Sequence, residues 1–251
     1  MKLSIIIPAK DEAHRIRPTI LDVYYSLTSR FNEEDFEVLV IVNNTTDETV
    51  DILQQVKKDN RFKSLQIIDI GKVNGKGEAV LQGVSMSQGD IIGFIDADGA
   101  SPGQDIVSLY RVLHRDVEYD AIISSRYMRK SKIIGHLPLT RHIMSRLFNI
   151  AVRTLFRLYF NDTQCGLKLF RAPVIKQVAP YIVAKGWTFD VNILLIMKYL
   201  GYKTKEHAST WYVKNGSKLN VAKAIPNVIK EFIQMYRQVI KYRIFSKLEH
   251  A

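Results

Sequence analysis

This 251-residue sequence lacks several features that would define its class at once. It contains one cysteine, Cys165, which excludes an internal disulfide and is typical of a reducing compartment. No run approaches the roughly 18 to 20 uncharged apolar residues that a membrane-spanning helix needs. The apolar run after Met1 and Lys2 ends at Pro8, which is too short for the core of a signal peptide. We therefore expect a cytoplasmic protein whose contact with a membrane is peripheral.

Repeats and low-complexity tracts are also missing, and the overall composition is ordinary. Apolar residues make up 47% and charged residues 24% of the chain, which are values of globular proteins rather than of disordered or fibrous ones. The length suits one α/β domain with peripheral additions. We expect a catalytic domain over residues 1–220, followed by a C-terminal helix over residues 221–251.

Acidic residues are scarce in two segments of an otherwise mixed chain. The sequence has 36 Lys and Arg against 25 Asp and Glu, for a net charge of +11. Residues 129–160 contain seven basic and no acidic residues, and residues 211–251 contain eight basic and two acidic ones. Positive charge concentrated in this way indicates an anionic partner: a phosphate group, a nucleic acid or an acidic membrane surface.

Short β-rich runs alternate with helical patterns, which is typical of βαβ units around a mainly parallel sheet flanked by helices. The first strand is expected to end at Pro8, and a final helix is expected to begin near Pro226, because proline suits a first helical turn. The other boundaries follow from apolar periodicity. The expected strands span residues 3–7, 36–42, 65–70, 91–95, 121–125 and 167–170, and the expected helices span residues 14–30, 49–58, 78–87, 140–159 and 191–200.

Polar clusters follow the strands that end near residues 7, 42 and 95. Ligands collect at the carboxyl ends of strands in open α/β sheets, so one crevice is expected to gather these clusters. Asp96 and Asp98 are one residue apart, and period-two geometry directs both carboxylates to the same side. Such a pair suits a Mg²⁺–diphosphate complex. A solvated Asp-Gly turn is the alternative interpretation.

The turn Gly75-Lys76-Gly77 precedes a predicted helix. It brings a cation and backbone N–H groups to a place where they can meet a phosphate. Its spacing matches neither a Walker A loop nor a dinucleotide-binding fingerprint, so an ordinary turn is the alternative.

Six motifs occur together in a particular order. They are residues 6–12 (IIPAKDE), 74–80 (NGKGEAV), 96–100 (DADGA), 125–126 (SR), 162–170 (DTQCGLKLF) and 187–191 (WTFDV). From residue 3 to about 220 the chain resembles the family 2 glycosyltransferases of GT-A fold, and specifically the polyprenyl (dolichyl) phosphate glucosyl- and mannosyltransferases. The DADGA form is more similar to the glucosyl branch.

This resemblance implies a metal-dependent hexosyltransferase and assigns roles to individual residues. Asp96 and Asp98 would hold the divalent metal, Mg²⁺ or Mn²⁺, and would act in catalysis together with Asp190. The nucleotide-sugar would contact Pro8, Ala9, Lys10, Glu12, Asn43, Asn44, Lys76, Asp96, Ala97 and Asp98. The acceptor or its phosphate would contact Arg126, Arg141, Gln164 and Lys218. The chain departs from the family pattern at residues 43–47 (NNTTD), at Lys10-Asp11 and at Asn192.

Other assignments remain open for three residues of the six motifs. Arg126 could be a surface arginine, and Asp190 could cap a helix beginning at Val191. Cys165 fits a small buried residue better than a nucleophile, because nothing nearby in the sequence supplies an activating histidine pair.

Two helices are both basic and amphipathic. In the helix expected over 140–159, a polar stripe recurs at steps of three and four, and the remaining surface is apolar. The final helix repeats this design, with Lys230, Arg237 and Lys241 opposite an apolar side. Helices of this type lie in the headgroup plane of anionic membranes. Alternatively, they cover the catalytic domain or pair with another subunit. The polar stripe comprises His142, Arg146, Asn149, Arg153 and Arg157.

The resemblance, together with the two basic helices, implies an inverting transferase on the cytoplasmic face of a membrane. It would move a hexose from a UDP-glucose or GDP-mannose type donor to a polyprenyl or dolichyl phosphate. A soluble transferase acting on a sugar hydroxyl would need a general base, and Asp190 is the candidate. A third interpretation is a nucleic-acid-binding protein, but no recognised binding motif occurs and nucleic acid would leave the wide apolar faces uncovered. We therefore expect no nucleic-acid partner.

Overall fold

The computed structural model describes residues 1–72, 75–214 and 221–248, with side chains in the last range described for 225–241. The boundary expected at residue 220 and the candidate acceptor residue Lys218 lie outside these ranges, as does Asn74 of the NGKGEAV motif. The strands are β1 (Leu3–Ala9), β2 (Phe36–Val42), β3 (Leu65–Asp69), β4 (Ile91–Phe94), β5 (Ala121–Ser125), β6 (Lys132–Ile134), β7 (Lys168–Arg171), β8 (Thr204–Ala208) and β9 (Thr210–Tyr212). The α-helices are α1 (Ile16–Thr28), α2 (Thr49–Lys57), α3 (Gly75–Met86), α4 (Gly103–Arg115), α5 (Leu139–Phe156), α6 (Ala172–Val178), α7 (Phe189–Tyr199) and α8 (Val221–Leu248), and short 3₁₀ turns cover Glu33–Asp35 and Ala179–Tyr181.

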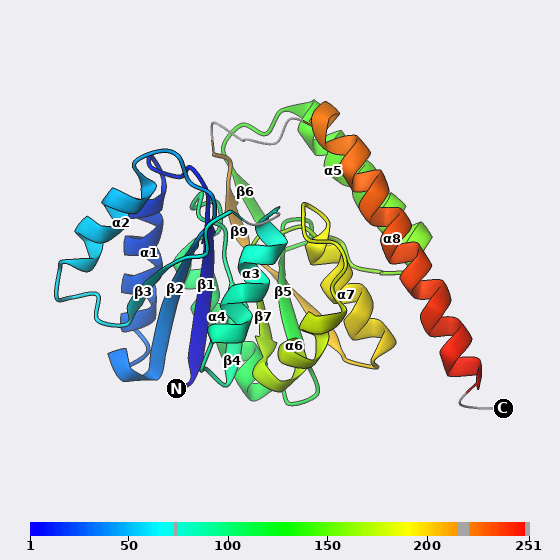
Figure 1. Ribbon diagram of the computed structural model, residues 1–251, viewed down its shortest axis with the longest axis horizontal. Helices are drawn as coiled ribbons and strands as arrows, with labels where there is room; N and C mark the ends of the chain where they lie inside the picture. The colour runs from blue at the N-terminus through cyan, green and yellow to red at the C-terminus, as the bar shows by residue number, and fades with distance from the viewer. Residues whose placement is uncertain (73–74, 215–220, 249–251) are drawn as a thin grey trace.

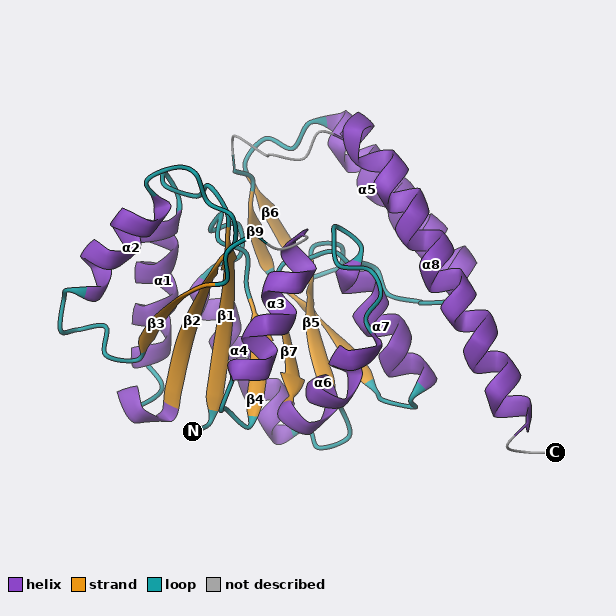
Figure 2. Ribbon diagram, viewed as in Figure 1, coloured by secondary structure: helices purple, strands orange, loops and turns teal. Residues whose placement is uncertain are grey.

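A seven-stranded sheet in the order β3-β2-β1-β4-β7-β5-β8 forms the centre of the molecule (Figure 2). β7 runs antiparallel to its neighbours β4 and β5, and the other pairings in this sheet are parallel. β6 and β9 form a separate two-stranded sheet. The α/β fold with a mainly parallel sheet is therefore confirmed.

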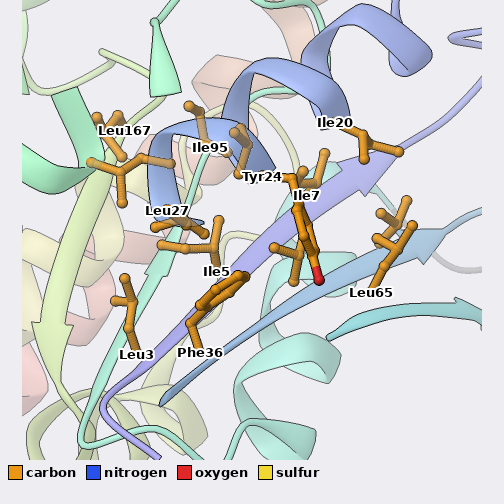
Figure 3. Close-up of a cluster of buried hydrophobic side chains, with 14 of the residues drawn as sticks. Leu3, Ile5, Ile7, Ile20, Tyr24, Leu27, Phe36, Leu65, Ile95 and Leu167 are labelled. Carbon is orange, nitrogen blue, oxygen red and sulfur yellow. The ribbon is translucent and has the colours of Figure 1, made fainter. Parts of the chain in front are cut away.

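Each face of the sheet is covered by its own set of helices (Figure 1). Apolar residues of α1, α2 and α4 pack on one face, and those of α3, α6 and α7 pack on the other. Figure 3 shows part of the first cluster, in which Tyr24 and Leu27 of α1 meet Ile5, Ile7 and Phe36 of the sheet. These residues are nearly inaccessible to water, and burial of apolar surface on both faces is what stabilises a parallel sheet.

The helices α5 and α8 form a further layer outside α7. Val152 and Phe156 of α5 cluster with Met235 and Val239 of α8 and with residues of α7. The ring of Phe232 lies 5.5 Å from that of Phe148 and 5.3 Å from that of Phe156, measured between centroids. Figure 1 shows α8 alongside α5 at one edge of the molecule.

Several expectations from the sequence differ from the structure. Pro8 does not end the first strand, because β1 continues to Ala9 with Pro8 opposite Ile41. Pro226 does not begin the last helix but lies inside α8, five residues beyond its start. Helix α4 was not among the expected elements, although Ile106, Leu109 and Leu113 have helical spacing and are buried.

Candidate active site

The loops after β1 and β2 are joined by hydrogen bonds at the carboxyl edge of the sheet. Asp11 has a φ of 51° and accepts hydrogen bonds from the Thr46 backbone N–H at 2.7 Å and from the Thr46 hydroxyl at 3.2 Å. The backbone N–H of Glu12 donates to the Thr49 hydroxyl at 2.7 Å. The two loops therefore form one wall, in which Pro8 is half-buried and Lys10 is exposed.

Two asparagines follow β2 in this wall. Asn43 is buried, and its side chain donates to the carbonyl of Gly75 at 3.2 Å, so the second strand end is tied to the start of α3. Asn44 adopts a left-handed φ of 49°, a conformation that asparagine tolerates better than most residues. The predicted nucleotide-binding positions Ala9, Asn43 and Asn44 thus lie together at adjacent strand ends, because Asn43 also donates its backbone N–H to the Ala9 carbonyl.

Asp96, Ala97 and Asp98 follow β4 beside this wall. The carbonyl of buried Ala97 accepts a hydrogen bond from Thr19 of α1 at 2.9 Å, which fixes the segment. Asp98 accepts the backbone N–H of Ala100 at 2.9 Å. Burial, and then the negative charge of Asp96, raise the pKa of Asp98 above its ordinary value. The segment is therefore a fixed and partly buried pair of carboxylates rather than a solvated turn.

Lys76 supplies a cation to this carboxylate pair. Its ammonium group forms an ion pair with Asp96 Oδ1 and lies 5.3 Å from the centre of the Phe189 ring. Burial opposes the charge on Lys76, but Asp96, and then Asp190 and Asp98, outweigh it and raise its pKa. Arg15 lies close enough to Asp98 to oppose the rise of its pKa, and forms an ion pair with Glu12 at 2.6 Å.

The glycines on either side of Lys76 allow close packing against another loop. Gly75 has a φ of 88°, and a Cβ atom there would lie 2.5 Å from the carbonyl oxygen of Lys185. The backbone N–H of Gly77 donates to the same oxygen at 2.9 Å. This N–H is therefore engaged within the protein, and the turn presents the Lys76 side chain to the site. α3 begins at Gly75, three residues before the expected start.

Asp190 is buried in an ion pair. Its Oδ1 atom lies 2.5 Å from Nζ of Lys168, whose side chain is fully buried and also donates to the Cys165 carbonyl at 2.7 Å. α7 begins at Phe189 with Thr188 as its N-cap, so Asp190 lies in the first turn and does not cap the helix. The predicted base is thus neutralised by a neighbouring lysine.

A second charged centre lies beyond the end of β5. The guanidinium of Arg126 donates to both carboxylate oxygens of buried Asp162, from Nε at 2.6 Å and from a terminal nitrogen at 2.9 Å. Burial opposes ionisation of Asp162, but Arg126 outweighs it and the pKa of Asp162 is lowered. Arg126 is mostly buried, which contradicts the alternative of a surface arginine.

Three arginines surround two aromatic rings at this centre. The guanidinium carbons of Arg126 and Arg141 each lie 5.3 Å from the Trp211 ring centre. Those of Arg126 and Arg146 lie 5.3 Å and 4.7 Å from the Tyr127 ring centre. We call Arg126, Arg141 and Arg146, with Tyr127 and Trp211, the arginine cluster. It carries three positive charges against the carboxylate of Asp162, so an anion is favoured there.

The remaining candidates lie next to this centre. Gln164 is half-buried, and its backbone N–H donates to Asp162 at 3.2 Å. Cys165 is buried against Ala100 and Trp211, and burial first, then Asp162, raise the pKa of its thiol. This agrees with a packing role rather than a nucleophile.

Sequence reasoning assigned no role to several residues that shape the site. Lys168 pairs with Asp190, Trp211 lies close to both Arg126 and Arg141, and Asp162 binds Arg126. A lysine within the predicted strand 167–170 was one available signal, because a buried charge in a strand needs a partner. The identity of that partner depends on the tertiary fold.

Comparison with known proteins identifies the family. The sequence model described as "Glycosyl transferase family 2" matches residues 4–178, which is more than half of the chain. The chain belongs to glycosyl transferase family 2. As a member of this family it is a glycosyltransferase.

Curated relatives of this family 2 glycosyltransferase include two eukaryotic enzymes. A dolichyl-phosphate beta-glucosyltransferase from Dictyostelium discoideum is 27% identical over 248 residues, covering 96% of this chain and 73% of the relative. A protein of the same name from Saccharomyces cerevisiae is 28% identical over 233 residues, covering 88% of this chain and 70% of the relative.

Solved structures with the same fold are GT-A glycosyltransferases. The mannosyltransferase PcManGT from Pyrobaculum calidifontis, in complex with GDP-Man and Mn²⁺, superimposes with a TM-score of 0.66 at 17% identity. The match covers 96% of this chain and 64% of that one. Glucosyl-3-phosphoglycerate synthase from Mycobacterium tuberculosis gives a TM-score of 0.68 at 16% identity, covering 94% of this chain and 80% of the other.

The residues of this family 2 glycosyltransferase fit a divalent cation. Asp96 and Asp98 place two partly buried carboxylates at one strand end. Burial first, and then the charge of Asp96, raise the pKa of Asp98, and added positive charge would favour the ionised form of both groups. Across residues 1–72, 75–214 and 221–248, no group of three or more potential protein ligands is assembled. The donor set therefore suits Mg²⁺ or Mn²⁺, which accept one or two carboxylates and complete their shells with water and phosphate oxygens.

Proposed function

We propose that this enzyme transfers glucose from a nucleotide-glucose donor to a dolichyl or other polyprenyl phosphate at a membrane surface. The names of the relatives support the glucosyl donor and the lipid phosphate acceptor. The carboxyl edge formed by β1, β2 and β4, with Lys76 and Asp96, is proposed to hold the donor. The arginine cluster is proposed to hold the acceptor phosphate, as the sequence analysis assigned for Arg126 and Arg141.

The observation that carries this proposal is the ion pair that buried Asp190 forms with Lys168. A hydroxyl acceptor must lose a proton, and it needs a free base within hydrogen-bond reach. Asp190, the candidate for that role, is buried and paired with Lys168. A phosphate monoester is largely dianionic at neutral pH, since its second pKa is about 6, and it needs no such base. The geometry therefore favours a phosphate over a sugar hydroxyl.

The reaction is a single displacement in this proposal. A phosphate oxygen of the acceptor forms a bond to the anomeric carbon while the bond from that carbon to the donor diphosphate breaks, so the configuration is inverted. Arg126, Arg141 and Arg146 orient the attacking phosphate, and Lys76 lies where it can offset the charge of the departing diphosphate. A divalent cation, when bound by Asp96 and Asp98, supplies further positive charge there.

The outward faces of α5 and α8 support the membrane location. Part of the polar stripe of α5 turns inward: Asn149 is buried, where it accepts a hydrogen bond from Thr163 at 3.2 Å, and Arg146 contacts Tyr127. Arg157, the last residue of the stripe, lies beyond the end of α5 and is exposed. The opposite side of α5 is apolar and exposed, as is one stripe of α8. We call these residues the apolar face. It comprises Leu139, Ile143, Met144, Leu147, Ile150 and Leu155 of α5 and Ile225, Ile229, Ile233, Tyr236 and Ile240 of α8.

Membrane contact through this face would be peripheral. Among the described residues, no helix combines the length and hydrophobicity needed to cross a bilayer. Lys230, Arg237 and Lys241 are exposed on α8, where they can meet anionic headgroups. We place the enzyme on the cytoplasmic side of the membrane. Nucleotide-sugars occur there, and a single unpaired cysteine is typical of a reducing compartment.

The proposal is tested by offering UDP-glucose and GDP-mannose to the purified protein with dolichyl phosphate in vesicles, with and without a chelator. We expect labelled lipid from UDP-glucose in the presence of Mg²⁺ or Mn²⁺. Asp98→Ala should lower turnover by at least about 100-fold, as loss of a principal electrostatic group does. Asp51→Ala, which removes an exposed carboxylate on α2, is the matched control and should be fully active.

Two results would contradict the proposal. One is transfer to a soluble sugar with none to dolichyl phosphate. The other is a covalent glycosyl-enzyme, which a single displacement does not form.

A further inference from the structure

Glu231 is an acidic residue in a basic helix. It is the single acidic residue between Val221 and Leu248, a segment with six basic residues. Its carboxylate does not face solvent but reaches the segment 184–188, which precedes α7. Oε1 accepts the backbone N–H of Gly186 at 2.7 Å, and Oε2 accepts the backbone N–H of Thr188 at 3.2 Å and its hydroxyl at 2.7 Å.

A side chain at residue 186 would have to displace this carboxylate. A Cβ atom on Gly186 would lie 2.6 Å from Glu231 Oε1. A second link from α8 reaches the same region, because Gln238 donates to the Tyr181 carbonyl at 2.6 Å and accepts from Asn192 at 3.2 Å. Asn192 in turn accepts the backbone N–H groups of Val183 and Ala184. α8 therefore holds the segment 181–188 at two places.

The same segment holds the turn that carries Lys76. The carbonyl of Lys185 accepts the N–H of Gly77 at 2.9 Å, and the Lys185 side chain forms an ion pair with Glu78 at 2.6 Å. Lys76 directly precedes these two residues and forms its own ion pair with Asp96. A continuous set of polar contacts thus runs from Glu231 on α8 through residues 185–188 to the proposed diphosphate site.

We propose that Glu231 is a positioning residue for donor binding. It couples the position of α8 to the placement of Lys76 beside Asp96. This inference rests on the proposed function, because it assigns the donor diphosphate to the Lys76 side of the site. Glu231 contacts neither Lys76 nor Asp96. It acts by fixing the backbone against which the Gly75-Lys76-Gly77 turn packs.

The chemistry of the contact requires a carboxylate. Three donors, two N–H groups and one hydroxyl, converge on the two carboxylate oxygens. Both oxygens carry negative charge and act only as hydrogen-bond acceptors. Glutamine has the same shape but only one acceptor oxygen, and its NH₂ group would face a donor. Glu231→Gln therefore removes half of the contact while preserving the packing of α8.

The test compares wild type with Glu231→Gln, using Gln234→Ala, an exposed position one turn further along α8, as the matched control. We expect Glu231→Gln to raise the KM for UDP-glucose about tenfold, in keeping with loss of a charge-assisted hydrogen bond. The KM for dolichyl phosphate and flotation with anionic vesicles should be unchanged. Gln234→Ala should match wild type in all three measurements.

Hydrogen exchange supplies a readout that is independent of turnover. Amides of Gly186, Thr188 and Gly77 should exchange at least about tenfold faster in Glu231→Gln than in wild type, while those of β1 and β2 keep their protection. Thr188→Val, which removes the hydroxyl donor at nearly constant volume, should have an effect on UDP-glucose KM that is not additive with Glu231→Gln.

Distinct outcomes separate this proposal from the proposed function. An unchanged UDP-glucose KM together with unchanged exchange at Gly77 would overturn the positioning role. Equal losses in the use of both substrates, with a lower unfolding midpoint, would also overturn it, because they indicate a purely structural contact. If wild type transfers no glucose at all, the proposed function fails, and exchange at Gly77 still decides whether α8 and the turn are coupled.

Discussion

At the scale of single residues, charges in this enzyme are stabilised by specific partners. Lys168 and Asp190 have almost no exposure, and each would be costly to bury alone. Their pairing lets the sheet carry a lysine in β7 beside Leu167 and Leu169, both of which are fully buried.

Removing one member of this pair should be more harmful than removing both. Lys168→Met should lower the free energy of unfolding by about 3 to 5 kcal/mol, because it leaves a buried carboxylate without its cation. Lys168→Met combined with Asp190→Leu should recover most of that loss. Urea unfolding at pH 7 measures both variants. A double variant as unstable as Lys168→Met alone would contradict the assignment.

Asp162 gives a prediction about pH. Its pKa is lowered below the ordinary 3.8, since Arg126 outweighs burial. A lowered acid pKa contributes stability that is fully present above the unfolded-state pKa and is lost as pH falls through the folded-state value. In Arg126→Met the largest contribution that opposes burial is lost, so the pKa of Asp162 should rise. The free energy of unfolding should therefore be lower than that of wild type at pH 7, and the difference should shrink as pH falls, because wild type then loses the contribution of its ionised Asp162.

Urea midpoints measured from pH 3 to pH 7 test this shift. Arg61→Met is the matched control, because Arg61 pairs with Asp59 at 2.6 Å on the surface, where solvent screens the interaction. Its pH profile should follow that of wild type closely. Parallel profiles for Arg126→Met and wild type would contradict the prediction.

At the scale of elements, the sequence predicted the positions of strands and helices better than the direction in which their faces point. The strand ends after β1, β2 and β4 were expected to meet, and they do, because parallel strands place their carboxyl ends at one edge. The polar stripe of α5 was also visible in the sequence. Periodicity does not say which side of a helix faces the protein. Arg146 and Asn149 of the stripe face inward, where they have partners.

Other elements were missed because their cause is non-local. β8 consists of polar and charged residues such as Lys205, Glu206 and His207, and its strand form depends on pairing with β5, which is about 80 residues away in the chain. Similarly, the charge pair of Lys168 with Asp190 joins a strand to a helix. No local pattern in the sequence predicts either contact.

The apolar face of α5 and α8 is an element-scale feature that vesicles can test. Leu147 and Ile150 are each 53% exposed, so charges placed there should not disturb the core. Leu147→Glu with Ile150→Glu should reduce flotation with anionic vesicles about tenfold or more, through lost apolar burial and added repulsion. The free energy of unfolding in solution should change by less than about 1 kcal/mol.

Val117→Glu is the matched control for these variants. Val117 is 84% exposed and lies between α4 and β5 in the sequence, so it belongs to neither α5 nor α8. This variant should float as wild type does. Equal flotation of the α5 double variant and wild type would contradict membrane binding through the apolar face.

At the scale of the whole molecule, charge and apolar surface occur in the same region. The net charge is +11, and the two segments rich in basic residues include α5 and α8. Association with an acidic membrane should therefore combine a salt-sensitive attraction with a salt-resistant apolar contribution.

Ionic strength separates the two contributions. Raising NaCl from about 0.05 M to about 0.5 M should weaken binding to anionic vesicles several-fold, as the Debye length shortens. At low salt, binding to neutral vesicles should be weaker than binding to anionic vesicles. It should change little as the salt concentration rises. Co-sedimentation measures both series. Salt-independent binding to anionic vesicles would show that the basic residues serve another purpose.

The two-sided character of α5 bears on how long an acceptor this enzyme can use. One helix, about 10 Å across with its side chains, separates the arginine cluster from the residues that we assign to the bilayer. An isoprenoid anchored in lipid could extend its phosphate past this helix while its hydrocarbon stays among the acyl chains. Discrimination would then rest on the headgroup, and polyprenols of very different lengths should be glucosylated at similar rates.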